Sequence, residues 1–217
     1  MDYRKHFAVE PGAKVRLSKI DASFKGKYES HKEAASEIQN HVERMDQLQT
    51  LLYADADKSL LVVLQALDAA GKDGVIRHVF SGMNPQGTFV FGFKQPSNYE
   101  AAHDFLWRAH LRTPGKGEVV IFNRSYYEDV LVVRVHKLVG DSVWSKRYDL
   151  INNFEAMLSL SGTTILSSSS ILVQTSSCLV SSSGSTTQRG AGRSARATIQ
   201  SAICGRTTWT PTRMPLH

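Results

Sequence analysis

Apolar residues recur at helical spacing in the first third of the chain and then gather into a short continuous run. The capping-box pattern Ser30-x-x-Glu33 is followed by apolar positions every three or four residues, which predicts a long amphipathic helix over residues 31–53. The next apolar run, residues 60–67, is interrupted only by Gln65 and is typical of a parallel strand buried on both faces. The pattern thus predicts a helix followed by a buried strand.

The same alternation continues through the middle of the chain. The predicted elements are a helix over 71–81, a strand over 88–93, a helix over about 97–111, a strand over 118–123, helices over 125–137 and 142–160, and a strand that begins at 163–166. Strands that alternate with helices indicate an α/β fold, a three-layer sheet with helices on both faces. In such a sheet, ligands bind at the carboxyl ends of the strands.

Composition separates the last part of the chain from the rest. The 217 residues are 41% hydrophobic and 21% charged, as in an ordinary globular domain. Residues 167–217, however, contain five Arg, 12 Ser and 8 Thr but no Lys, Asp or Glu, so the net charge of +6 arises almost wholly there. We therefore predict an N-terminal arm (1–30), an incomplete core domain (31–166) and a disordered Ser/Thr/Arg-rich tail (167–217).

The turn after the first predicted strand carries the pattern of a phosphate-binding loop. Residues 66–74 read ALDAAGKDG, so Lys72 follows a glycine between a strand and a helix. Free backbone N–H groups and the helix dipole hold phosphate in such a loop, and the lysine neutralises its charge. Ala66 stands where the general Walker A motif has glycine, so an ordinary strand–helix turn is the alternative. The predicted phosphate-binding residues beside the lysine are Ala69, Ala70, Gly71, Asp73 and Gly74.

A second polar cluster follows the strand predicted over 118–123. The segment EVVIFNRSYYEDV brings Asn123, Arg124, Glu128 and Asp129 to the same edge of the sheet. Phosphoryl transfer needs cations on the transferring oxygens and carboxylates that hold Mg²⁺, so we expect Arg124 to stabilise charge. Asp68 in the first motif is a candidate magnesium ligand or base. The alternative is that Arg124 and Glu128 form only a surface ion pair.

These segments closely resemble the polyphosphate kinase 2 family over roughly residues 5–166. The resemblance rests on LQALDAAGKDGVIRHVFSGMNPQG, then HDFLWRAH, then GEVVIFNRSYYEDVLVVRVH, in that order. It implies a P-loop kinase-like fold and transfer of phosphate between inorganic polyphosphate and a nucleoside mono- or diphosphate. In the family, the Asp and Lys of D-x-x-G-K are catalytic, which implies these roles for Asp68 and Lys72. The family's second motif is similar to Asn123-Arg124-Ser125.

Further basic side chains near the predicted strand ends are candidates for a polyphosphate track, because a long polyanion needs spaced cations. They are Lys94, Arg108, Arg112 and Arg134, of which Arg108 and Arg134 are taken as binding residues. Mg²⁺ is the expected cofactor. The expected partners are polyphosphate and nucleotides, whether AMP, ADP, ATP or guanine analogues, with no specific nucleic acid and no membrane. Members of the family commonly form dimers or tetramers, which implies a homo-oligomer if the chain is intact.

Two other functional classes are compatible with parts of the sequence. One is a different small P-loop kinase that uses ATP and a small-molecule acceptor. The other is a noncatalytic polyanion-binding protein, which the sequence pI near 9.4 suggests but the location of the excess charge in the tail disfavours. No apolar run is long enough to span a membrane, and the opening MDYRKHF lacks the apolar core of a secretory signal. We therefore expect a cytoplasmic protein.

The tail does not match the family, which continues after the fourth strand with a lid and further helices. If one base is deleted after the codon for Leu166, codons for SSSSILVQTSSCLVSSSG can be chosen that read KFFLHISTDEQLSRFKQR in the original frame. Codons for the following segment, STTQRGAGRSARATIQS, can likewise be chosen that read LDDPARSWKISEGDYSE in the original frame. Together these strings contain the family pattern R-F-x-x-R-x-x-D-P-x-x-x-W-K-I-S. Our hypothesis is a frameshift that removes the lid and the C-terminal helices and leaves an inactive or weakly active chain.

The hypothesis predicts that the coding DNA, resequenced across residues 160–217, has lost one base near the codon for Leu166. The same DNA read in the neighbouring frame should then encode the family pattern. A confirmed gene whose alternate frame encodes an unrelated string would contradict the hypothesis, and the tail would then be genuine.

Overall fold

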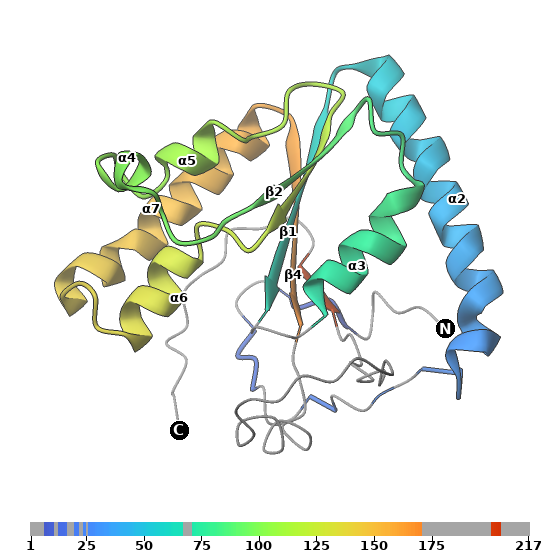
Figure 1. The fold of residues 1–217 in the computed structure, drawn as a ribbon, viewed down its shortest axis with the longest axis horizontal. Helices are drawn as coiled ribbons and strands as arrows, with labels where there is room; N and C mark the ends of the chain where they lie inside the picture. Colours follow the sequence, from blue (N-terminus) through green and yellow to red (C-terminus); the bar gives the residue numbers. More distant parts are fainter. Residues whose placement is uncertain are drawn as a thin grey trace, which may run out of the picture.

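The computed structural model is an α/β fold whose sheet lies between two layers of helices (Figure 1). It describes residues 7–10, 13–16, 20–21, 24, 26–66, 71–170 and 201–204. The strands are β1 (Ser59–Ala66), β2 (Thr88–Gly92), β3 (Val119–Asn123), β4 (Thr163–Ser170) and β5 (Ser201–Cys204), in the order β2-β3-β1-β4-β5. The first four are parallel and β5 is antiparallel to β4. This confirms the predicted fold class.

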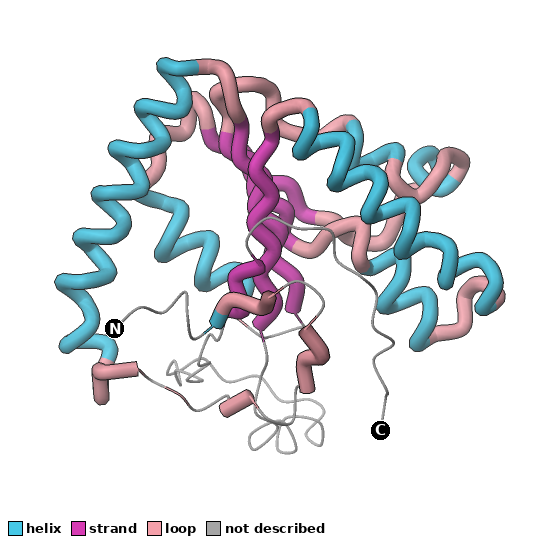
Figure 2. Tube along the Cα trace, turned by 180° about the vertical axis from the view of Figure 1, so that it is seen from behind, coloured by secondary structure: helices cyan, strands magenta, loops and turns pink. Residues whose placement is uncertain are grey.

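Helices cover both faces of the sheet. They are α2 (His31–Asp55), α3 (Lys72–Val79), the 3₁₀ helix η2 (Phe80–Gly82), α4 (Asn98–Ala101), α5 (Trp107–His110), α6 (Glu128–Val135) and α7 (Asp141–Leu160). Helices α2 and α3 lie on one side of the sheet and α4 to α7 on the other, as Figures 1 and 2 show from opposite directions. Among the helices that the structure describes, none is both long and apolar enough to cross a membrane.

The alternating faces of β1 and β3 form two separate cores. Leu61, Val63 and Phe122 pack against α5, α6 and α7, whereas Val62 and Ile121 pack toward α2 and α3. Both strands are therefore apolar at nearly every position, because each face of a central parallel strand is covered. Leu60 pairs with Val119 and Leu64 with Asn123, so the two strands end at the same edge of the sheet.

The prediction of one continuous helix over 97–111 is wrong, because the structure has two short helices there, α4 and α5. A complete capping box between Ser97 and Glu100 starts α4, as its sequence suggests. The Asp104 carboxylate then accepts a hydrogen bond from the backbone N–H of Leu106, at 2.9 Å. A side chain that bonds to its own backbone in this way competes with the helical hydrogen bonds, so the helix is interrupted before Trp107.

The predicted end of the core at residue 166 does not coincide with the end of a strand. Strand β4 runs on to Ser170, with Ser167 to Ser170 opposite Val63 to Ala66 of β1. Serine provides the same backbone donors and acceptors as an apolar residue, so the ladder continues although the side chains are polar. Apart from β5, residues 171–217 lie outside the described part of the chain, as do most of residues 1–25, and the predicted domain boundaries stay a prediction.

Candidate functional site

The turn from β1 to α3 holds the predicted catalytic lysine. Gly71 caps α3 in a left-handed conformation, with φ of 83°, which glycine adopts without a side-chain clash. Lys72 is 8% exposed, and its ammonium donates a hydrogen bond to the carbonyl of Ala66, at 3.2 Å. The cation therefore lies at the carboxyl end of β1, as the phosphate-loop prediction requires. Residues 67–70, which include the predicted Asp68, Ala69 and Ala70, lie outside the described residues.

A hydrogen bond joins the two sequence motifs across the sheet edge. The side-chain amide of Asn123, the last residue of β3, donates to the Asp73 carboxylate of α3 over 2.7 Å. Gly74, the next residue, has open space where a Cβ would stand. The structure thus brings Asn123 to the same edge as Lys72 and Asp73, although Asn123 and Asp73 are 50 residues apart in the chain.

Arg124 begins a sharply turned segment that leads into α6. Its φ is 62°, a left-handed conformation that is strained for any residue with a Cβ. The Arg124 N–H donates to the carbonyl of Leu64 on β1, at 3.0 Å. The Ser125 hydroxyl, wholly buried, accepts from the Tyr127 N–H at 3.2 Å. These bonds hold the predicted charge-stabilising arginine at the ends of β1 and β3.

Gln65 links the end of β1 to the start of α6. Its amide nitrogen donates to the carboxylate of Glu128, and its amide oxygen accepts from the Ser125 hydroxyl, at 3.4 Å. Glu128 is therefore at the predicted edge and has a partner on β1. The signal for Gln65 was visible in the sequence, since it is the one polar residue within an apolar strand, yet sequence reasoning gave it no role.

Asp129 lies between two arginines. Its carboxylate is 3.5 Å from Arg108 of α5 and 3.9 Å from Arg147 of α7, and Arg147 also donates to the Asp129 backbone carbonyl, at 2.7 Å. Burial raises the pKa of the Asp129 carboxyl, although the charges of Arg108 and Arg147 act to lower it. The structure thus places Asp129 and Arg108, both predicted to bind substrate, in contact with each other. Arg147 was missed, because nothing in its local sequence marks it.

Two of the other predicted cations, Arg112 and Arg134, lie against aromatic rings. Arg134 stacks over Trp144 at 5.0 Å from the ring centroid and Arg112 over Phe91 at 4.8 Å. Such stacking accommodates a guanidinium at a surface without an acidic partner. The structure does not bring Arg134 together with Lys72 in any described contact, so its binding role stays a prediction.

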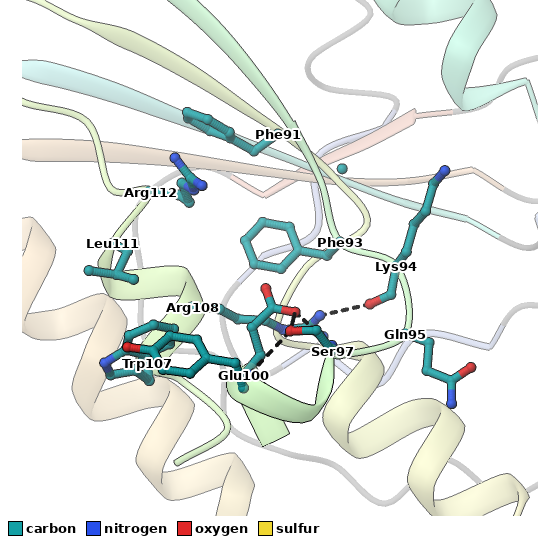
Figure 3. A pocket seen from close by; sticks show the side chains of 12 residues that line it. Phe91, Phe93, Lys94, Gln95, Ser97, Glu100, Trp107, Arg108, Leu111 and Arg112 are labelled. Carbon is teal, nitrogen blue, oxygen red and sulfur yellow. Dashed lines mark hydrogen bonds between the residues drawn. The ribbon is translucent and has the colours of Figure 1, made fainter. Parts of the chain in front are cut away.

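A pocket of about 500 Å³ opens beside the end of β2 (Figure 3). Its walls come from β2 and the segment after it and from α4 and α5. They combine aromatic rings, among them Phe91, Phe93 and Trp107, with the cationic residues Lys94, Arg108 and Arg112. Trp107 also takes part in an aromatic stack with His103, at 4.1 Å and 17° between the rings. The sequence analysis named the three cations as candidates for a polyphosphate track but gave the aromatic walls no role.

Two tyrosines of the second motif converge on a buried carboxylate. The hydroxyls of Tyr126 and Tyr127 both donate to the same Glu155 oxygen of α7, at 2.7 and 2.6 Å. Burial raises the pKa of Glu155, and the tyrosine hydrogen bonds only partly offset this effect. Burial likewise raises the pKa of Tyr126 well above its usual value. Glu155 therefore anchors the segment that follows Arg124, and it lies in no recognisable motif.

Comparison with known families matches residues 15–169 to the family described as Polyphosphate kinase 2. The chain belongs to this family. It is 51% identical over 163 residues to an AMP/ADP-polyphosphate phosphotransferase of Meiothermus ruber, a match that covers 75% of this chain and 61% of that protein. It is 47% identical over 174 residues to an ADP-polyphosphate phosphotransferase of Rhodopseudomonas palustris, which covers 75% of this chain and 60% of the relative.

The fold of this polyphosphate kinase 2 chain agrees with a solved member of the family. The crystal structure of polyphosphate kinase 2 from Arthrobacter aurescens TC1 matches with a TM-score of 0.71 and 37% sequence identity, over 76% of this chain and 59% of that one. The agreement confirms the P-loop kinase-like arrangement that the resemblance implied. The chain thus spans about three fifths of the length of the relatives that it matches.

The strained turn of the family's second motif gives a test in which two substitutions differ only by a Cβ. Arg124→Ala and Arg124→Gly both remove the guanidinium, but only alanine keeps a Cβ at a φ of 62°. We expect the glycine variant to have the higher free energy of unfolding, by about 1 kcal/mol, in denaturant titrations. At Arg134, within helix α6, the same pair should differ by about 1 kcal/mol in the opposite direction. Equal signs at both positions would contradict a strained turn.

The buried Glu155 carboxyl predicts a pH dependence of stability. Because its folded pKa is raised, the unfolded chain loses this proton first as the pH rises. The free energy of unfolding is therefore highest below the ordinary pKa of glutamate and falls until the raised folded pKa is passed. Glu155→Gln can still accept hydrogen bonds from both tyrosines but cannot ionise. As the pH rises through this interval, the free energy of unfolding of the variant should therefore increase relative to that of the unaltered chain.

Denaturant titrations at a series of pH values measure this difference directly. The carboxyl of Asp129 contributes with the same sign, but it is present in both proteins and cancels in the comparison. A difference that stays constant with pH would show that Glu155 does not titrate in this interval.

Proposed function

We propose that this chain is the catalytic part of a polyphosphate:nucleotide phosphotransferase, which moves a phosphoryl group between inorganic polyphosphate and a nucleoside mono- or diphosphate. The observation that carries the proposal is the hydrogen bond between Asn123 and Asp73, which joins the two family motifs at the edge where Lys72 and Arg124 also lie. The names of the relatives from Meiothermus ruber and Rhodopseudomonas palustris support the choice of substrates.

Each residue of this edge has a proposed task in the transfer. Lys72 leaves the Ala66 carbonyl and neutralises the phosphate that is transferred, while the N-terminal N–H groups of α3 bind its oxygens. Arg124 stabilises the charge that develops between donor and acceptor. Asp68 is the proposed acid–base or metal-binding carboxylate of the loop. Asn123 holds Asp73 at the edge, and Gln65 holds Glu128 there.

Mg²⁺ is the proposed cofactor. The candidate ligands at the edge are carboxylates and amides, the oxygen donors that Mg²⁺ prefers, and Mg²⁺ usually takes one or two carboxylates together with substrate phosphates and water. The donor set therefore fits the ion, with Asp68 as the proposed ligand. When bound, Mg²⁺ would neutralise part of the charge on the phosphates.

The pocket beside β2 is the proposed site of the acceptor nucleotide. Its aromatic walls suit the faces of a base, and its cations suit the phosphates of AMP, ADP or a guanine analogue. Strand β2 pairs with β3 so that Gly92 is opposite Asn123. The pocket mouth is thus one strand away from the edge where transfer is proposed, and ATP would be the product. Assembly into a homo-oligomer and a cytoplasmic location are further parts of this proposal.

The proposal predicts that the purified chain forms ATP from ADP and polyphosphate when Mg²⁺ is present, at the low rate that loss of the lid implies, measured with a luciferase readout. Lys72→Met should lower the rate by about 100-fold or more, because a cation that acts on the transferring phosphate is lost. Lys116→Met is the matched control, since Lys116 is largely exposed and pairs with Asp57 away from the edge, and its rate should not change.

The donor assay also separates this function from that of another small P-loop kinase. If ATP and not polyphosphate supplies the phosphoryl group to the acceptor, the donor assignment is wrong although the site is correct. If neither donor supports transfer, the activity proposed for this chain is contradicted.

A further inference from the structure

The guanidinium of Arg108 is occupied by protein groups. One nitrogen donates to the backbone carbonyl of Lys94, at 2.7 Å, and the other contacts the Asp129 carboxylate, at 3.5 Å. The face of the group lies over the Phe93 ring, at 5.2 Å. The side chain is only 10% exposed, so little of its surface is left for a substrate. This arrangement is typical of an arginine that supports another residue.

Asp129 contacts Arg108 directly, and Arg147 contacts Asp129. Arg147 of α7 donates to the Asp129 carbonyl and lies beside its carboxylate, while its own guanidinium stacks on Phe105, at 4.7 Å. The three charged side chains are 10 to 18% exposed. The contacts of Asp129 with both arginines, and of Arg108 with the Lys94 carbonyl, tie α5, α6 and α7 to the segment after β2.

Lys94 is fixed by its backbone and open at its side chain. The preceding N–H, of Phe93, donates to the Asn123 carbonyl at 2.9 Å, and the Lys94 carbonyl is held by Arg108. The side chain is exposed and extends away from Arg108 at the edge of the pocket (Figure 3). The ammonium is therefore presented to solvent from a backbone that is anchored at both ends.

We propose that Arg108 is a positioning residue, which holds Lys94 so that the Lys94 ammonium contacts a phosphate of the polyanionic substrate. Asp129 and Arg147 position Arg108 in turn. The inference rests on the proposed function, because it takes the substrate to be a phosphate polyanion. The phosphate belongs either to polyphosphate or to the acceptor nucleotide, which share this chemistry. Arg108 and Asp129, on this account, do not touch the substrate.

Salt dependence of binding separates contact from positioning. A cation that contacts a polyanion releases counterions, so its removal lowers the slope of log K against log salt concentration by about one. Calorimetric titrations of the full chain with medium-chain polyphosphate, and separately with ADP, would be made at several salt concentrations. Lys94→Met should weaken binding about tenfold and lower the slope. Arg108→Met should weaken binding and lower the slope by no more than Lys94→Met does, because Arg108 acts only through the Lys94 contact.

The double variant Lys94→Met/Arg108→Met tests whether Arg108 acts through Lys94. Its affinity for the phosphate ligand should equal that of Lys94→Met alone, to within about twofold. If the two side chains made independent contacts, their losses of binding free energy would add. Arg77→Met is the matched control, because Arg77 is exposed on α3 across the sheet, and it should bind as the unaltered chain does. Whichever titration responds to Lys94→Met identifies the source of the phosphate.

Two results would overturn the inference. One is a slope that falls by about two in the double variant, which makes Arg108 a second contact residue, and the other is losses of binding free energy that add in the double variant. Hydrogen exchange followed by mass spectrometry decides the positioning role without any ligand, because the peptide over residues 93–97 should exchange faster in Arg108→Met but not in Lys94→Met. Unchanged exchange there also overturns it. A chain that binds neither polyphosphate nor ADP contradicts the proposed function, and the exchange result still stands.

Discussion

The parallel pairing of β1 with β3 is the constraint on which the site depends. The register places Leu64 opposite Asn123, and the Leu64 carbonyl accepts from the N–H of Arg124 just beyond the strand. Both strands are buried on both faces by apolar side chains, so a shift of register would change which side chains fill each core and leave backbone groups at the strand ends without partners. The packing of both cores therefore holds the two motifs at the same edge.

Buried polar groups then set the positions of the side chains around that edge. Asp129 and Glu155 are both shielded carboxyls with raised pKa values, and each is surrounded by donors from other elements. Both depend on these partners, because burying a carboxylate without hydrogen-bond donors or cations destabilises the fold. They connect α5, α6 and α7 to the segments that follow β2 and β3. The helical layer on this side is thus joined to the site by charge as well as by packing.

Local sequence was enough to predict an element wherever its signal comes from neighbouring residues in the chain. The capping residue Ser30, the apolar run of β1 and the Gly-Lys turn each depend on neighbours in the chain, and their elements were predicted to within a few residues. The helix over 97–111 was wrong because the side chain of Asp104 bonds to the Leu106 N–H, a choice that helical periodicity does not reveal. Arg147 and Glu155 were missed because their partners are 18 and 28 to 29 residues away.

The fold class, the family resemblance and the identity of the motif residues could be predicted from the sequence, because strand and helix periods and short motifs are local properties. The contacts of those residues could not. The tertiary structure paired Asn123 with Asp73, directed Arg108 toward Lys94 and Asp129, and formed a pocket from β2, α4 and α5. These contacts depend on sheet order and helix packing, which join residues that no local pattern connects.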